Sequence, residues 1–371
     1  MAMTAAEIFV TGCGMVSALG LDAATSCAAA RAGVSRATEL QWLEPGTDQA
    51  WGGAPLIGHA VNLANGTTGF GKAVALGSLA LRDLLASAGL TARDVDGTGM
   101  VVNVSNRRLE DDQAIAEAET ADPGELELPS GVWQKLTAGL IDRLAASCGF
   151  RPLTSAQHVI YGGHTGFIKA IEIAAQLVQA GLVARCIVGA IDSLIDPPAL
   201  RAAFLLGFLR EPKRPIGFIP GEVAGFMLIE SQTTQHRVRR INQGRVAAIS
   251  RRHTPDSKTD QPAKGKALAR VIEDVLTESN TLFIGDLNGQ ESRGIEWGYA
   301  QVHLTKRCPA FKPHHLWLPA QNFGEVGAAS GVVAACMALR ALQRDYAPSR
   351  NIVAWLSSEV DTAAFRIERW D

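Results

Sequence analysis

A largely apolar helix between two short strands constrains the fold of this chain most. Residues 158–190 predict a strand ending at Tyr161, a two-glycine turn, a helix over 165–180 and a second strand over 186–189. The polar residues of the helix fall on one narrow stripe, and apolar residues cover the rest. Such a helix must be buried on most of its circumference. The unit therefore predicts an α/β protein in which this helix packs between layers.

Similar units recur on both sides of it. Upstream, apolar residues at helical spacing over 70–90 precede a buried strand at 99–104, and residues 217–230 read as a hairpin-like pair of apolar segments. Downstream, the pattern predicts strands at 246–249 and 282–285, helices at 267–276, near 297–302 and within 324–342, and a final strand pair at 352–356 and 363–367. Alternating units of this kind imply helices covering both faces of mostly parallel sheets.

The net charge and the composition limit the classes of function that we expect for this chain. The 35 basic and 37 acidic side chains give a formal charge of −2, so nothing favours binding to nucleic acid or to an anionic membrane. The N-terminus has no basic segment before an apolar run, and no apolar run is long enough to span a bilayer, so we expect a cytoplasmic protein. The basic stretch 236–240 and the acidic run 110–112 are expected to be solvated, and residues 103–135 to be excursions from the core.

Cysteines and histidines give no sign of a metal site. The cysteines lack the paired spacing of zinc ligands and are expected to be buried free thiols; they are Cys13, Cys27, Cys148, Cys186, Cys308 and Cys336. His303, His314 and His315 have no ligand partner at helical spacing and are expected at the surface or in loops. We therefore expect neither a metal nor a cofactor.

Four glycine-containing segments carry a family resemblance. They are 11–20 (TGCGMVSALG), 30–35 (ARAGVS), 217–225 (GFIPGEVAG) and 327–331 (GAASG). In this order and at these intervals they resemble β-ketoacyl synthases, of the thiolase fold superfamily, over essentially the whole chain. The resemblance implies an α/β, thiolase-like fold of two duplicated βαβαβαββ halves, residues 1–240 and 241–371, stacked as five αβαβα layers in one compact unit. The insert that the family has after Arg214-Pro215 is missing.

The same resemblance locates a changed active site. His164 stands where the family has its nucleophilic cysteine, and Asn288 stands where it has its first catalytic histidine. The place of the second histidine falls on Gly324, with Glu325 beside it, and the glycine-rich C-terminal gate of the family is replaced at 357–362. Condensation needs a thiolate to carry the acyl group and two imidazoles to polarise the malonyl thioester. The resemblance therefore implies degenerate active-site positions and no condensing activity.

Three functions remain open from the sequence. The first is a non-condensing partner or accessory subunit of an acyl or polyketide-type system, as a homodimer or a heterodimer with a thiolase-fold protein; an acyl carrier protein or acyl thioester is a further candidate partner. The second is an acyltransferase or thioester hydrolase in which His164, at a helix N-terminus, acts as base or acyl acceptor with Asn288 and Glu325 facing it. Alternatively, His164 only fills the space of the family's active-site pocket and hydrogen-bonds locally. The third is a scaffold protein of a bacterial biosynthetic or secretion cluster.

Overall fold

The computed structural model describes most of the chain. The described residues are 3–40, 56–106, 137–211, 214–231, 244–253, 265–312, 315–358 and 361–370. The basic stretch 236–240, the acidic run 110–112, His314 and most of the excursion predicted over 103–135 lie outside them.

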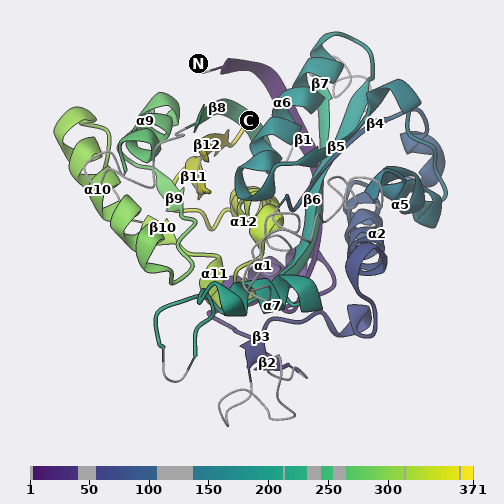
Figure 1. Ribbon diagram of the computed structural model, residues 1–371. Helices are drawn as coiled ribbons and strands as arrows, with labels where there is room; N and C mark the ends of the chain where they lie inside the picture. The colour runs from purple at the N-terminus through teal and green to yellow at the C-terminus, as the bar shows by residue number, and fades with distance from the viewer. Residues whose placement is uncertain are drawn as a thin grey trace, which may run out of the picture.

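One sheet forms the centre of the described structure (Figure 1). Its ten strands run in the order β10-β9-β11-β12-β8-β1-β7-β6-β4-β5. In chain order they are β1 (Met3–Ser17), β4 (Gly99–Val104), β5 (Gln157–Tyr161), β6 (Arg185–Ser193), β7 (Glu222–Ser231), β8 (Gly244–His253), β9 (Leu282–Ile284), β10 (His315–Trp317), β11 (Asn351–Ser357) and β12 (Asp361–Glu368). A separate pair, β2 (Thr38–Glu39) and β3 (Ile57–Gly58), lies apart from this sheet.

The two ends of the sheet have the same topology. Counting strands along the chain within each end, the order from edge to centre is third, second, fourth, fifth, first: β5-β4-β6-β7-β1 on one side and β10-β9-β11-β12-β8 on the other. The two first strands, β1 and β8, pair antiparallel in the middle and join the ends. The duplication expected from the order of elements is therefore confirmed. The boundary at residue 240 remains a prediction, because 232–243 lie outside the described residues.

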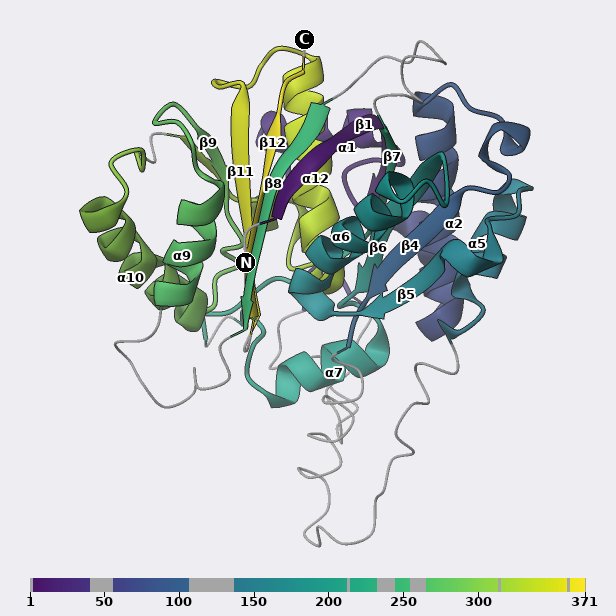
Figure 2. The same cartoon turned by 90° about the horizontal axis from the view of Figure 1, so that it is seen from above.

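Helices cover the sheet in three layers (Figure 2). The outer layer against the N-terminal strands contains α2 and α5, the outer layer against the C-terminal strands contains α9 and α10, and α6 and α12 lie between the two parts of the sheet. These helices are α2 (Gly69–Ser87), α5 (Leu140–Cys148), α6 (Gly166–Gln179), α9 (Lys266–Val275), α10 (Glu291–Arg307) and α12 (Ser330–Gln343). The arrangement is the five-layered αβαβα stack that the sequence predicted.

Close packing within and between layers explains why two of the glycines stand where they do. Phe167 and Ile168 of α6 are fully buried, and burial of each such side chain is worth about 1.5–3 kcal/mol. A Cβ added at Gly331 of α12 would lie 2.7 Å from Cδ1 of Phe167, so the two helices approach closely only because residue 331 has no side chain. Likewise a Cβ at Gly14 would lie 2.2 Å from the backbone nitrogen of Leu84, where β1 meets α2. Both glycines belong to segments that carry the family resemblance.

Two predictions are wrong. The sheet is not mostly parallel, because five of the nine strand pairings in its described part are antiparallel. The second concerns the predicted hairpin. Residues 217–230 do not form a hairpin: β7 begins at Glu222 and pairs antiparallel with β6 and β1, which come from elsewhere in the chain. The residues before it make isolated bridges instead, Phe218 with Leu209 and Pro220 with Glu325. The apolar alternation showed correctly that both segments are buried, but local sequence does not determine which strand a segment pairs with.

Candidate functional site

His164 lies in a tight turn between β5 and α6. The turn requires a left-handed backbone at Gly163, with φ of +52°, and it buries His164 to 1% exposure. Asn103, at the end of β4, fixes this turn through its side-chain amide. It donates to the carbonyl of Gly163 at 2.9 Å and to the carbonyl of Ala328 at 3.0 Å. The imidazole is thus held directly before the N-terminus of a buried helix, between the two parts of the sheet.

Glu325 faces His164 across the site. Its Oε1 lies 2.8 Å from Nε2 of His164 and accepts a further hydrogen bond from the backbone nitrogen of Gly327 at 2.8 Å. Its Oε2 accepts from the side-chain amide of Asn288. An ionised Glu325 can only accept, so the proton on this contact belongs to Nε2 of His164. The structure therefore brings together His164, Asn288 and Glu325 in one hydrogen-bonded group.

Asn288 is held from two further directions. Its Nδ2 also donates to Oε1 of Gln290 at 2.9 Å, and its Oδ1 accepts from the backbone nitrogen of Gln290 at 3.0 Å. Both ends of the amide are engaged within the loop that leads into α10. Asn288 therefore serves as a fixed donor to Glu325.

A buried ion pair, Arg293 with Asp286, lies close to Glu325 in the candidate site. Arg293 of α10 pairs with Asp286 and also donates to the backbone carbonyl of Asp286 at 3.1 Å. Burial alone would lower the pKa of Arg293, but the negative charges of Asp286 and Glu325 outweigh it, and the pKa is raised. Asp286 Oδ2 also accepts from the backbone nitrogen of Ser357 at 3.0 Å, at the end of β11. The guanidinium is therefore a permanent positive charge beside the two carboxylates.

Gly324 has no side chain and contributes only its backbone to the candidate site. Its φ of +74° favours glycine, and a Cβ there would lie 2.8 Å from both Cδ2 of His59 and the carbonyl oxygen of Ile219. A side chain at residue 324 therefore has no room, and the carboxylate of Glu325 is what reaches His164.

His59 is a buried imidazole that sequence reasoning missed. It is 1% exposed, and its Nδ1 has no hydrogen-bond partner within the described structure. Burial lowers its pKa from 6.5 to about 4, so the ring is neutral at pH 7. It comes from the end of β3 and reaches Gly324 only through the tertiary fold, and no local pattern around it signals this. Asn103 and the pair of Asp286 with Arg293 were also missed.

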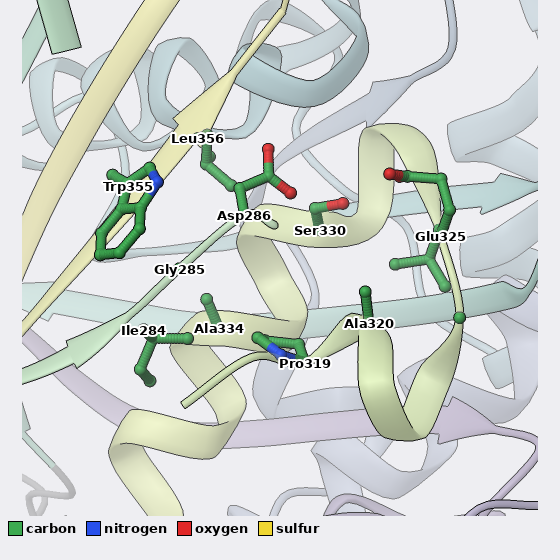
Figure 3. Close-up of a pocket in the computed structure, with 12 residues that line it drawn as sticks. Ile284, Gly285, Asp286, Pro319, Ala320, Glu325, Ser330, Ala334, Trp355 and Leu356 are labelled. Atoms are coloured by element: carbon green, nitrogen blue, oxygen red, sulfur yellow. The ribbon is translucent and has the colours of Figure 1, made fainter. Parts of the chain in front are cut away.

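The cavity beside Glu325 is small. It has a volume of about 20 Å³, which is room for about one water molecule. Figure 3 shows Asp286 and Ser330 near its middle, the indole of Trp355 on one side and Glu325 on the other. None of the described residues that line it is a cysteine. An extended acyl-thioester arm does not fit this space.

A second buried carboxylate lies in the N-terminal half. Glu222 of β7 is fully buried and binds Nζ of Lys72 at 2.9 Å, the hydroxyl of Ser193 at 2.7 Å and the backbone nitrogen of Val61 at 2.7 Å. Its polar contacts tie α2, β6 and the segment after β3 to one strand.

The remaining sequence candidates lie away from this group. All six cysteines are free, and Cys148 alone among them is half-exposed. His303 lies half-buried on α10 and His315 is exposed on β10. In the part of the chain that the structure describes, no three metal-binding side chains gather at one point. No described helix is long and apolar enough to cross a membrane.

Comparison with known proteins finds similarity in structure but not in sequence. No family model matches the chain, and neither does any curated protein sequence. Among solved structures, the chain superposes on the type II ketosynthase complex described as AntDE:AntF with a TM-score of 0.74 and 15% identity, over 98% of this chain and 99% of the other.

Two other matches come from different kinds of assembly. The ketosynthase of module 6 of the bacillaene synthase of Bacillus subtilis 168 gives a TM-score of 0.72 at 11% identity, covering 99% of this chain and 72% of the other. The ishigamide ketosynthase/chain length factor gives 0.62 at 18% identity, covering 99% and 100%. Similarity at this level of identity establishes the shared fold.

Proposed function

On the premise that this chain has the thiolase-like fold of ketosynthases, we propose that it is a non-condensing subunit that acts by assembling with a second thiolase-fold chain. The observation that carries the proposal is the mutual bonding of His164, Asn288 and Glu325, the side chains at or beside the degenerate catalytic positions. The proposal places this subunit in the cytoplasm, within an acyl or polyketide-type system.

The chemistry of the site supports the absence of condensation. No described residue lining the cavity offers a thiolate, and the imidazole present is already bonded to a carboxylate. Loss of a nucleophile from a cooperative catalytic unit costs about 10⁶ in rate, or roughly 8 kcal/mol of barrier. Further losses add little, because the unit is already broken. A cavity of about 20 Å³ also leaves no room for the two substrates.

An assay with acyl and malonyl thioesters tests this part of the proposal. We expect no condensed product by mass spectrometry, for the native chain and for His164→Ala alike. Turnover by the native chain that His164→Ala abolishes would overturn the proposal.

The sheet offers a surface for assembly. β5 is the outermost strand on its side and pairs with β4 alone among the described strands. At the opposite end, β10 has only three residues. An outer strand presents backbone donors and acceptors that a second chain can pair with. Two of the similar structures are assemblies: one contains a ketosynthase with its acyl carrier protein, and the other is a ketosynthase/chain length factor. Association through β5 is therefore the interaction that we propose for this chain.

The assembly is tested by the mass of the purified protein and by co-purification from its host. We expect a dimer, with itself or with another thiolase-fold chain. His158→Glu places a carboxylate on β5, and in a homodimer the same charge from the second chain lies on the paired strand, so this variant should dissociate. His303→Glu makes the same change on α10, at a site that is also half-buried, and should leave assembly unchanged. Recovery of only free monomer would contradict the proposal.

One observation favours an enzyme of altered chemistry as a second candidate. The contact between His164 and Glu325 is the imidazole–carboxylate pairing that orients a general base or an acyl-accepting imidazole. If this candidate is correct, incubation with an acyl thioester gives a mass increase equal to the acyl group, or releases free acid. His164→Ala removes either signal, whereas His303→Ala keeps it. No acyl adduct and no hydrolysis would exclude this candidate.

A further inference from the structure

A cleft of about 570 Å³ lies between α1 (Ala23–Arg31) and the C-terminal end of α12. Its described lining combines small side chains with three arginines and one tyrosine: Ala24, Cys27, Ala28, Arg31, Ala32, Arg340, Arg344 and Tyr346. The volume falls within the range of small-molecule sites in proteins, about 300–1,000 Å³. The cleft is far from His164, because the N-terminus of α12 lies beside the site and its 14 residues span roughly 21 Å.

None of the three guanidinium groups forms an ion pair with a carboxylate in the described structure. Arg31 lies over the ring of Tyr346, with 4.2 Å from its Cζ to the ring centroid, and Arg340 donates to the uncharged amide of Gln343. Arg344 is exposed and follows Arg340 by four residues, so the two stand on the same side of α12. The walls of the cleft therefore carry three positive charges.

The ends of the two helices do not account for these charges. Arg31 is the last residue of α1, and Arg340 and Arg344 lie at the end of α12, where a helix carries a partial charge of about −0.5. Two helix ends therefore offset about one of the three positive charges of the lining. The lining itself stays positive, which suits a ligand with an anionic group.

The acidic groups close to the cleft are engaged elsewhere. Asp22 accepts from the backbone nitrogen of Thr25 at 2.6 Å, as the N-cap of α1. Asp83 accepts from the backbone nitrogens of Met15 at 2.9 Å and Ala23 at 2.8 Å. These hydrogen bonds go to the backbone of β1 and α1, so neither carboxylate is bonded to a cleft arginine, although the charge of Arg340 does act on Asp83.

The rest of the lining is uncharged. Burial raises the pKa of Tyr346 to about 12 and also raises the pKa of Cys27, so the phenol and the thiol are both neutral at pH 7. Ala24, Ala28 and Ala32 recur every four residues and form a smooth apolar strip along α1. Arginine forks match phosphate oxygens, and an apolar strip beside them suits a flat or aliphatic body.

We propose that this cleft binds a small molecule that joins a phosphate group, or two linked phosphates, to an apolar body. Arg340 and Arg344 hold the anionic end, Arg31 and Tyr346 flank it, and the alanine strip of α1 contacts the body. Nothing in this binding requires the site at His164, so it goes beyond the proposed function and is independent of it.

Calorimetry with two probes on the full-length protein tests the proposal. Inorganic pyrophosphate tests binding of the ligand's anionic group alone. A nucleoside diphosphate such as ADP tests binding of the anionic group and the attached apolar body together. At low salt we expect both to bind, ADP at least about 10-fold more tightly than pyrophosphate, and uncharged adenosine not to bind. The double variant Arg340→Gln/Arg344→Gln should weaken both probes at least about 10-fold.

Two further variants separate a built site from a general effect of charge or stability. Arg270→Gln/Arg307→Gln removes the same number of charges from α9 and α10 and should leave both affinities unchanged. Ala28→Trp keeps every arginine but fills the cleft, and should abolish ADP binding. This variant still tests the proposal if the double arginine variant does not fold. The proposal is overturned if neither probe binds at millimolar concentration. It is equally overturned if the α9/α10 variant weakens binding as much as the cleft variant, or if Ala28→Trp leaves ADP binding intact.

Discussion

Glu325, in the candidate site, and Glu222, in the N-terminal half, are two buried carboxylates with the same kinds of hydrogen-bond partner. Each accepts one nitrogen from a basic side chain, one neutral side-chain donor and one backbone N–H. For Glu222 these come from Lys72, Ser193 and Val61, and for Glu325 from His164, Asn288 and Gly327. A buried carboxylate that accepts three such hydrogen bonds is stabilised within the protein.

The two groups differ in the basic partner. Lys72 is a cation, whereas the imidazole of His164 can hold the carboxylate as a neutral donor. The comparison indicates that the hydrogen bonding around Glu325 is of a kind that also occurs away from the candidate site, at Glu222.

Lys72→Met should destabilise the protein most. It leaves the fully buried Glu222 without its cation, and removal of one partner of a buried ion pair costs about 3–5 kcal/mol. Urea denaturation measures the free energy of unfolding. Lys169→Met, on the exposed side of α6, serves as the control and should change it by less than about 0.5 kcal/mol. Equal effects of the two variants would contradict a structural role for Lys72.

His59 should make stability depend on pH. Its pKa is about 4 in the folded chain, against 6.5 for an ordinary histidine, so the unfolded chain binds more protons between these limits. The stability is fully present above pH 6.5 and is lost as the pH falls towards 4, by up to about 3 kcal/mol. Unfolding measured from pH 7.5 to 4 should show this fall, and His59→Gln should flatten it. His253→Gln, which changes an exposed ring, should not. An unchanged slope in His59→Gln would exclude His59 as the cause.

His164→Ala should cost less than Lys72→Met. If His164 is a neutral donor, its removal leaves one acceptor of Glu325 unsatisfied, which costs about 1–3 kcal/mol. The same denaturation experiment measures it, with His303→Ala on α10 as the control. A loss as large as that for Lys72→Met would show that His164 is a cation in the folded state and would make the two clusters electrostatically alike.

Asn288→Ala should give the smallest change, about 1 kcal/mol. It removes a neutral donor, and Glu325 keeps its contacts with His164 and Gly327. Ser193→Ala is the matched change at Glu222 and should cost a similar amount. A loss several-fold larger for Asn288 than for Ser193 would show that the site group depends on its amide in a way that the Glu222 group does not.

Much of the fold could be predicted because it depends on local sequence patterns. The buried helix α6 and the turn before it at His164 follow from apolar periodicity and the turn glycines. Gly14 and Gly331 were selected by the family resemblance, and their close packing is seen only in the structure. The pairing of β7 was not, because strand partners depend on tertiary structure, and α5 was not anticipated at all.

The candidate site divides in the same way. Sequence reasoning selected His164, Asn288 and Glu325, and the structure brings them into contact. It did not identify His59 or Arg293, which enter the site from a short strand and a helix whose own sequences carry no sign of it. Gly324 was predicted as the position of a missing histidine, and the steric contact with His59 shows why only glycine fits there.

The pairing of β1 with β8 has a consequence for how the molecule can be divided. Residues 8–10 of β1 are bonded to β7 on one side and to residues 244–246 of β8 on the other. Cutting the chain between the two repeats would leave one unpaired strand edge in each fragment, on β1 and on β8, and exposed strand edges promote aggregation. The two repeats should therefore unfold together, in a single cooperative transition.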